Sequence, residues 1–315
     1  MKTLIGKMLL YFILILFFLE IFVRVFNLYF EYPPYYINDA NVKTYLPNQE
    51  GNYTTGNRRM KYAKFNINES GFNSYREYTP TKDKIDIALI GDSFIEGFHQ
   101  DFDNSIGKKV ENNLNNNASV FEYGHSGYDL ADQLHLIKAY EEQFKLIDHI
   151  FIYLKFNNDL ERSKYTPNHW RVNLQYSTSF LIRDKIKLTT YAEGIGIFDS
   201  FLDLKDKILG IPLENFDMDA EVSEADSIKY LENFKTLINT FGINKSKTSF
   251  LLDKRTTSRH FLDYCKKMDY NYVDFGDLFE KSESPTTLIY DMHWNNHGRD
   301  LIANSISSYL TKKSL

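Results

Sequence analysis

The amino-acid sequence predicts a three-layer α/β fold, in which a doubly wound, mostly parallel sheet carries helices on both faces and an apolar helix precedes it. From Ile85 onward, short apolar runs alternate with stretches of helical periodicity, a pattern typical of crossover units. The composition, 43% hydrophobic and 25% charged, is that of a globular protein. The first 28 residues contain an apolar run of the length that crosses a bilayer.

Residues 1–28 are interpreted as a signal anchor with a transmembrane helix. Lys2 and Lys7 precede the apolar segment 8–26, which favours an N-terminus inside and the rest of the chain outside the cytoplasm. No small-residue cleavage site follows, so an uncleaved anchor is favoured over a cleaved signal peptide, the alternative that stays open. Glu20 and Arg24 are four residues apart and are expected to pair on one helix face.

Residues 29–84 are polar and aromatic, and they are expected to form a stalk and lead-in with one strand at 61–68. Residues 85–315 form the predicted α/β domain, with an insertion at about 163–222 that could be a lid or a wall of a site. The expected strands of this domain are 85–90, 120–123, 149–154, 249–252 and 270–275, and the expected helices are 105–114, 130–144, 223–240 and 258–267.

Composition also excludes some functions. The net charge of −5, without a basic stripe, argues against a nucleic-acid partner. Cys265 is the single cysteine, which rules out an intramolecular disulfide and predicts a buried, inert thiol.

Four short polar blocks carry the candidate chemistry: "GDSF" at 91–94, "YGHSGYD" at 123–129, "FNND" at 156–159 and "DMHWNNHG" at 291–298. Three of them follow predicted strands, and ligands of doubly wound sheets bind outside the carboxyl ends of the strands. His293 is a candidate base for the Ser93 hydroxyl, and Asp291 could orient its ring. The backbone N–H groups of Ser93 and Gly127 and the side-chain amide of Asn158 are candidate donors to an oxyanion.

In order, the blocks supply a serine, a glycine, an asparagine and a histidine, and this set resembles the SGNH branch of the GDSL hydrolases over roughly residues 85–310. The resemblance implies an SGNH-hydrolase, flavodoxin-like fold. It also implies Ser93 as nucleophile with Asp291 and His293 completing a triad, and Ser93, Gly127 and Asn158 forming the oxyanion hole. An α/β-hydrolase elbow is disfavoured, because Ile95 stands where its motif Gly-x-Ser-x-Gly has the second glycine.

Two departures from the family pattern stand out. Asp291 is two residues before His293 instead of three, with Tyr290 in the usual place, and this shorter form followed by Trp294 is similar to that of alginate O-acetyltransferase relatives. Phe156 replaces the glycine that normally begins the third block, which changes the backbone freedom before Asn158.

Simpler interpretations exist for single residues. Ser93 could be a helix cap, Gly127 a turn glycine, and Asp92 a brace of the turn. His293 and His297 with Asp291 do not match a metal motif, so neither a metal nor another cofactor is expected. Trp294 is expected to pack beneath the histidine turn.

The sequence thus predicts a single-pass membrane protein with an extracytoplasmic serine esterase domain. Its partners would be the lipid bilayer, through residues 8–26, and an ester-bearing small molecule or glycan, with O-acyl esters such as acetyl on cell-envelope glycans as the expected substrate. Acyl transfer to a sugar hydroxyl, and a non-catalytic anchored binding protein with the same fold, are the alternatives.

Overall fold

The computed structural model describes residues 2–56, 59–79, 83–197, 223–289 and 291–313 of the chain. Its centre is a five-stranded sheet in which all neighbouring strands are parallel, in the order β6-β5-β7-β8-β9. Numbered along the chain, this order is 2-1-3-4-5, that of flavodoxin-like doubly wound sheets. The strands are β5 (Ile85–Gly91), β6 (Ala118–Gly124), β7 (His149–Tyr153), β8 (Thr248–Leu252) and β9 (Asn271–Asp274). The predicted fold class and all five predicted strands are confirmed.

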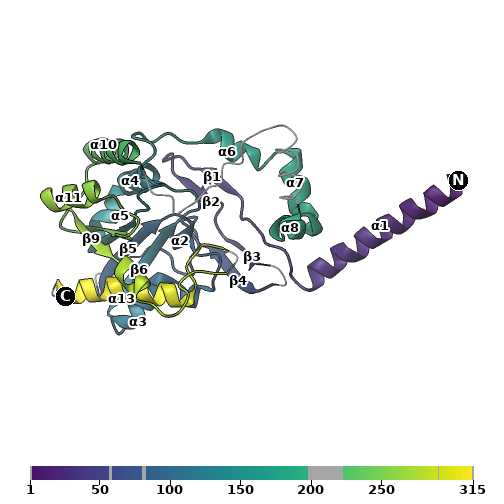
Figure 1. Cartoon of the computed structure of the whole chain (residues 1–315), viewed down its shortest axis with the longest axis horizontal. Helices are drawn as coiled ribbons and strands as arrows, with labels where there is room; N and C mark the ends of the chain where they lie inside the picture. Colours follow the sequence, from purple (N-terminus) through teal and green to yellow (C-terminus); the bar gives the residue numbers. More distant parts are fainter. Residues whose placement is uncertain (1, 57–58, 80–82, 198–222, 290, 314–315) are drawn as a thin grey trace.

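Helices cover both faces of this sheet (Figure 1). One face carries α3 (Ile106–Asn113) and α13 (Asn296–Lys312), and the other carries α4 (Leu130–Ala139), α5 (Glu141–Leu146), α10 (Glu224–Phe241) and α11 (Arg259–Lys267). Side chains of β5 alternate between the two faces, so Ile87 and Leu89 join one apolar cluster while Ala88 and Ile90 join the other. Burial on both faces explains why this strand is a continuous apolar run.

One helix prediction was wrong in detail. The segment 130–144 forms two helices that meet at Tyr140, whose backbone (φ −110°, ψ 35°) leaves the helical region. Its hydroxyl accepts a hydrogen bond of 2.7 Å from the amide of Asn38, a residue of the lead-in. That contact is distant in sequence, so helical periodicity could not reveal the break.

The lead-in contains more regular structure than the one expected strand. Strands β1 (Tyr35–Ile37) and β2 (Lys43–Tyr45) pair antiparallel, as do β3 (Gln49–Thr55) and β4 (Lys61–Ile67). Buried residues of these hairpins, Tyr45, Phe65 and Ile67, pack with Phe98 from the segment after β5. The lead-in therefore lies against the main sheet, close to the end of β5.

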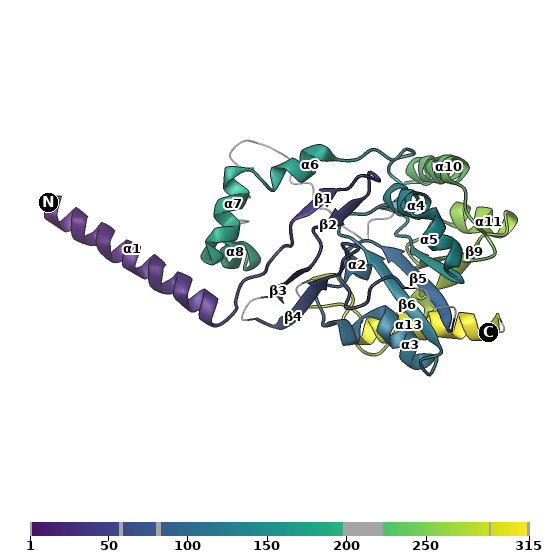
Figure 2. The same ribbon diagram turned by 180° about the vertical axis from the view of Figure 1, so that it is seen from behind.

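Helix α1 (Lys2–Val25) projects from the body, and α8 (Lys187–Gly194) lies beside its C-terminal end, as both views show (Figures 1 and 2). Its segment Leu4–Val25 is long and apolar enough to cross a membrane by length and composition, and a signal sequence would pass the same test. The expected pair forms, with 2.7 Å between Arg24 and Glu20, and the Glu20 carboxylate also accepts the backbone N–H groups of Lys187 and Leu188.

The predicted insertion contributes α6 (His169–Leu174), α7 (Thr178–Lys185) and α8, while its residues 198–222 lie outside the described residues. The remaining short helices are α2 (Ser93–Glu96), the 3-10 helix η1 (Phe102–Asn104) and α12 (Gly276–Glu280). Cys265 is fully buried, and burial raises the pKa of its thiol to about 12, as expected of an inert core cysteine.

Phe156, which begins the third polar block, belongs to the core. It is 1% exposed and packs against Phe261 and Tyr230, with ring centroids 5.3 and 5.8 Å away. Its side chain therefore supports the packing of α10 and α11.

Phe156→Ala should destabilise the protein by about 3 to 5 kcal/mol, because it removes a fully buried ring and leaves a cavity. Denaturant unfolding followed by fluorescence would measure this loss. Phe102→Ala is the matched control, since Phe102 is only half-buried, and it should cost clearly less. Equal losses for the two variants would contradict the core assignment.

Candidate active site

Ser93 stands at the carboxyl end of β5, where the strand passes into α2. Asp92 caps this helix and accepts the N–H of Phe94 at 2.9 Å, which confirms its predicted bracing role. Gly97, with φ +69°, ends the helix after one turn. Every residue from Gly91 to Gln100 is buried except Ser93. A rigid, buried turn therefore presents one accessible hydroxyl.

The histidine turn comes from the chain segment just before α13. His293 Nε2 lies 2.7 Å from Ser93 Oγ, and His293 Nδ1 contacts Asp291 Oδ1. Asp291 Oδ1 also accepts the backbone N–H of His293 at 2.8 Å. The short Asp-x-His spacing thus allows one carboxylate oxygen to hold both the ring and the backbone of His293. The structure brings Ser93, His293 and Asp291 together.

Trp294 fastens this turn to the core. It is 4% exposed, and its ring packs against Phe94, Tyr153 and Phe275 at centroid distances of 4.7, 4.9 and 5.4 Å. The packing role predicted for Trp294 is confirmed. His297, by contrast, points away from this centre and bonds to Ser282 Oγ at 2.8 Å.

A second histidine completes the hydrogen bonding of Asp291. His99 Nε2 lies 2.9 Å from Asp291 Oδ2, and its ring stacks on His293 with 4.0 Å between centroids. Burial lowers the pKa of His99, so the ring is neutral at pH 7 and donates its Nε2 proton to the carboxylate. Although burial acts in the opposite sense, the hydrogen bonds from His293 and His99 hold the pKa of Asp291 well below its usual range. Asp291 therefore stays charged between two imidazoles.

Gly127 lies in the turn that follows β6. The N–H of Tyr128 bonds to His125 O at 3.0 Å, and Gly127 has φ +72°, a conformation that favours glycine at the third position of a tight turn. His125 N donates to Gly91 O at 3.1 Å, which ties this turn to the end of β5. Among the described residues, neither the Gly127 N–H nor the Ser93 N–H has a protein acceptor. Both are free to bind an oxyanion.

Asn158 lies in the turn after β7. The turn is closed by Asp159, whose carboxylate accepts the Lys155 N–H at 2.7 Å. Asn158 itself is exposed, and within the described parts of the chain its side-chain amide makes no hydrogen bond. No contact joins this amide to Ser93, so its place in an oxyanion hole stays a prediction.

Sequence reasoning missed the buried carboxylate of Glu96. It accepts the Tyr45 hydroxyl at 2.5 Å and the Ser126 N–H at 2.6 Å, and so links the lead-in to the Gly127 turn. Burial raises the pKa of Glu96 to about 7. The only sequence signals for Glu96 and His99 are charged or polar letters inside the apolar stretch "FIEGFHQ", which do not reveal their partners.

His99, Asp291 and His293 also offer ligand atoms within 4.8 Å of one another, a set that could hold a metal ion. In the arrangement described, both nitrogens of His293 and both carboxylate oxygens of Asp291 are already engaged. A metal would have to displace the contact between His293 and Ser93 or those with Asp291. The geometry fits a hydrogen-bonded chain better than a metal centre.

Glu96→Gln should gain stability relative to the wild type as pH rises from about 4.5 to about 7. The folded wild type keeps the Glu96 proton in this window while the unfolded chain loses it, so wild-type stability falls with pH. Below and above the window the difference between the two proteins should be constant. Thermal unfolding of both at several pH values measures this, and parallel curves throughout would contradict the raised pKa.

Comparisons with known proteins give no family assignment: no family model matches the chain, and no curated protein matches it. Among solved structures, the esterase EstA from Pseudoalteromonas sp. aligns over 73% of this chain and 98% of its own, at 13% identity and a TM-score of 0.42. A carbohydrate acetylesterase family member from Sinorhizobium meliloti aligns over 72% of this chain and 97% of its own, at 10% identity and a TM-score of 0.39. A member of the lipolytic G-D-S-L family from Veillonella parvula aligns over 72% of this chain and 98% of its own, at 14% identity and a TM-score of 0.39. Identities and TM-scores this low do not establish membership of a family.

Proposed function

We propose that this protein is a serine-dependent ester hydrolase that acts on O-acyl esters, such as acetyl, of cell-envelope glycans or related small molecules. The observation that carries the proposal is the hydrogen-bonded chain from Ser93 through His293 to Asp291, with 2.7 Å between Ser93 Oγ and His293 Nε2. A serine is a useful nucleophile when a nearby base accepts its proton and a third group orients that base.

In the proposed mechanism, His293 Nε2 takes the proton of Ser93 while Oγ attacks the ester carbonyl. The tetrahedral intermediate collapses, and the leaving alcohol takes that proton from His293. Water, activated by the same histidine, then attacks the acyl-enzyme, which releases the carboxylic acid and restores the Ser93 hydroxyl. This sequence balances without a cofactor.

The oxyanion of both intermediates would be held by the free N–H groups of Ser93 and Gly127. Asn158 is the proposed third donor, because its exposed amide can turn toward a bound substrate from the end of β7. One well-placed donor of this kind is worth roughly 3 to 4 kcal/mol of barrier. The ring of Phe156 lies in the core and does not enter this group of donors.

His99 is a positioning residue in this scheme. Its hydrogen bond to Asp291 Oδ2 fixes the carboxylate, which in turn fixes the His293 tautomer with Nδ1 protonated. A base held in this tautomer presents an unprotonated Nε2 to Ser93.

The location of this activity follows from α1. We propose that the helix is an uncleaved anchor through residues 8–26 and that the esterase domain is extracytoplasmic, at the cell surface or in the periplasm. The lysines before the apolar segment and its spanning length support this orientation.

Acyl transfer to a sugar hydroxyl shares the first half of the mechanism. A cavity of about 370 Å³ beside Ser126 offers room for an acceptor. Faster release of the alcohol from an activated ester when a sugar is added, with acylated sugar as product, would identify transfer.

Ser93→Ala should abolish turnover of p-nitrophenyl acetate by the full-length protein in detergent, with a loss of at least about 1,000-fold, because no other group can form the acyl-enzyme. A fluorophosphonate probe should label the wild type and not this variant. Ser246→Ala, which changes an exposed serine, is the control and should keep full activity. Equal rates for wild type and Ser93→Ala would contradict the triad.

Two substitutions of His99 distinguish its hydrogen bond to Asp291 from its stacking on His293. His99→Phe keeps a ring that can stack on His293 but removes the donor to Asp291, and it should lower kcat roughly 10- to 100-fold with little change in KM. His99→Gln keeps a donor at the Nε2 position and should recover much of the rate. A kcat unchanged in His99→Phe would remove His99 from the mechanism.

For the topology, alkaline phosphatase fused after Leu315 should be active, since this reporter requires export from the cytoplasm. A fused reporter that works only in the cytoplasm should be inactive at the same position. The reverse pair of results would contradict the proposed orientation.

A further inference from the structure

A cavity of about 370 Å³ lies beside the candidate oxyanion turn, and the four polar sequence blocks did not predict it. Its walls come from three parts of the chain: the lead-in with Tyr35 and Lys43, the turn after β6 with Ser126, and the insertion with Arg171 in α6 and Tyr176 between α6 and α7. The insertion was expected to be a lid or wall of a site, and its helices α6 and α7 do line this cavity.

Lys43 places a largely buried ammonium group in this cavity. Its Nζ donates to Ser126 O at 3.0 Å and lies 5.3 Å from the centre of the Tyr128 ring. No carboxylate of the described residues is within ion-pair distance of it. Burial lowers the pKa of Lys43 and the nearby charge of Arg171 lowers it further, while Asp132 and Glu96 act in the opposite sense.

Arg171 places a second cation over the same turn. A Cβ built on Gly127 would lie 3.5 Å from Arg171 Nη1, so the guanidinium stands directly above the glycine. Within the described chain, this guanidinium makes no hydrogen bond and no ion pair. Its backbone is held in place, since Tyr35 donates its hydroxyl to Arg171 O at 3.1 Å. The Arg171 side chain is exposed, and its guanidinium is therefore accessible to an anion that enters the cavity.

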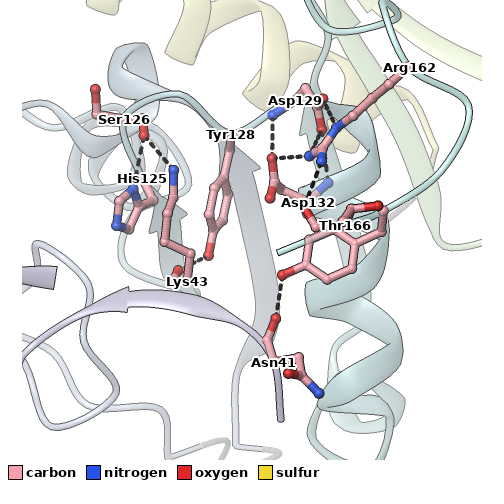
Figure 3. Close-up of polar contacts among 10 residues, drawn as sticks. Asn41, Lys43, His125, Ser126, Tyr128, Asp129, Asp132, Arg162 and Thr166 are labelled. Carbon is pink, nitrogen blue, oxygen red and sulfur yellow. Dashed lines mark hydrogen bonds and ion pairs between the residues drawn. The ribbon is translucent and has the colours of Figure 1, made fainter. Parts of the chain in front are cut away.

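The acidic residues closest to this pair of cations are already engaged. Arg162 binds Asp129 and Asp132, with a contact of 2.8 Å to Asp129 Oδ1 and one of 2.7 Å to Asp132 Oδ2. In Figure 3, Tyr128 and Lys43 lie in the middle, with the Arg162 clamp on one side of them and Ser126 on the other. Glu96 is bonded to Tyr45 and to the Ser126 N–H. In the described chain, neither Lys43 nor Arg171 is in ion-pair contact with any of these carboxylates.

Aromatic rings supply the rest of the surface. Tyr35, Tyr176 and Phe180 line the cavity, and Tyr176 is 57% exposed. Rings with an apolar face and a polar edge suit a pyranose, which also has apolar faces and hydroxyl edges. The lining combines such rings with the cations Lys43 and Arg171 and with a third cation, Arg183, which is paired with Asp184 at 3.2 Å.

We infer that this cavity is a subsite for an anionic sugar, whose carboxylate or phosphate binds Arg171 and Lys43 while its O-acyl group lies at Ser93. The inference rests on the proposed function and names its substrate class. The Gly127 N–H, which would hold the oxyanion, is part of the turn that Arg171 covers, so the anionic group would bind next to the oxyanion turn.

The test uses the full-length protein in detergent and three soluble esters: an O-acetylated hexuronic acid, its uncharged hexuronamide, and an O-acetylated hexose 6-phosphate. Either charged ester should be turned over with a kcat/KM about tenfold or more above that of the amide, mostly through KM. The better of the two identifies carboxylate or phosphate as the anion. Equal kcat/KM for all three would overturn the subsite.

Arg171→Gln should remove most of this preference and leave p-nitrophenyl acetate turnover near the wild-type level, because its guanidinium holds no structural contact. Arg171→Lys should restore part of the preference. Lys138→Gln removes an exposed positive charge on α4 and is the matched control, which should keep the preference. A preference unchanged in Arg171→Gln would contradict the assignment.

Binding separates failure of the subsite from failure of the proposed chemistry. Calorimetry with free hexuronate and hexose 6-phosphate should show binding to Ser93→Ala and a loss of about tenfold or more when Arg171→Gln is added. Binding without any ester turnover by the wild type would sustain the subsite and reject the esterase. Turnover of p-nitrophenyl acetate without anion binding would do the opposite.

Discussion

The parallel hydrogen-bonded register of β5 with β6 and β7 is the constraint on which the site depends. Because Gly91 pairs with Gly124 at the ends of the first two strands, the turns that carry Ser93 and Gly127 must emerge side by side. The two glycines also make this closeness possible. A Cβ on Gly124 would lie 2.0 Å from the Glu96 backbone nitrogen, so any larger residue would push α2 and its serine away from the strand end.

The polar groups around Ser93 form one connected system. The carboxylate of Asp291 is shared by two stacked imidazoles, and only His293 also reaches the serine. When His293 becomes charged during acyl transfer, the neighbouring neutral His99 adds no repulsion, since burial lowers its pKa. Glu96 supports the facing turn in a similar way, because its two hydrogen bonds join Tyr45 of the lead-in to Ser126. Residues far apart in sequence therefore fix both halves of the candidate site.

Much of the α/β domain could be predicted from the sequence, because strands buried on both faces are apolar runs and their turns carry polar blocks. Those blocks also contain Ser93, Gly127, Asn158, Asp291 and His293, of which the serine, the aspartate and the histidine meet in the structure. His99 could not be found in this way, since it belongs to none of the polar blocks and its contact with Asp291 leaves no local pattern in the sequence. Of the lead-in hairpins, only strand β4 was predicted. The hairpins are held by contacts with Phe98 and Glu96, and tertiary contacts of this kind produce no local periodicity in the sequence.

The carboxylate of Glu20 accepts the first N–H groups of α8, and Arg24 beside it donates to Lys185 O, so the end of α1 is bonded to the insertion that walls the cavity. If α1 lies in a bilayer, these bonds would fix the position of the domain relative to the membrane in addition to attaching it. The height and tilt of the cavity above the lipid surface would be set by the helix itself. Such a protein would sample a thin layer of the envelope at a constant distance from the membrane, and the length of a glycan would decide which of its ester groups come within reach.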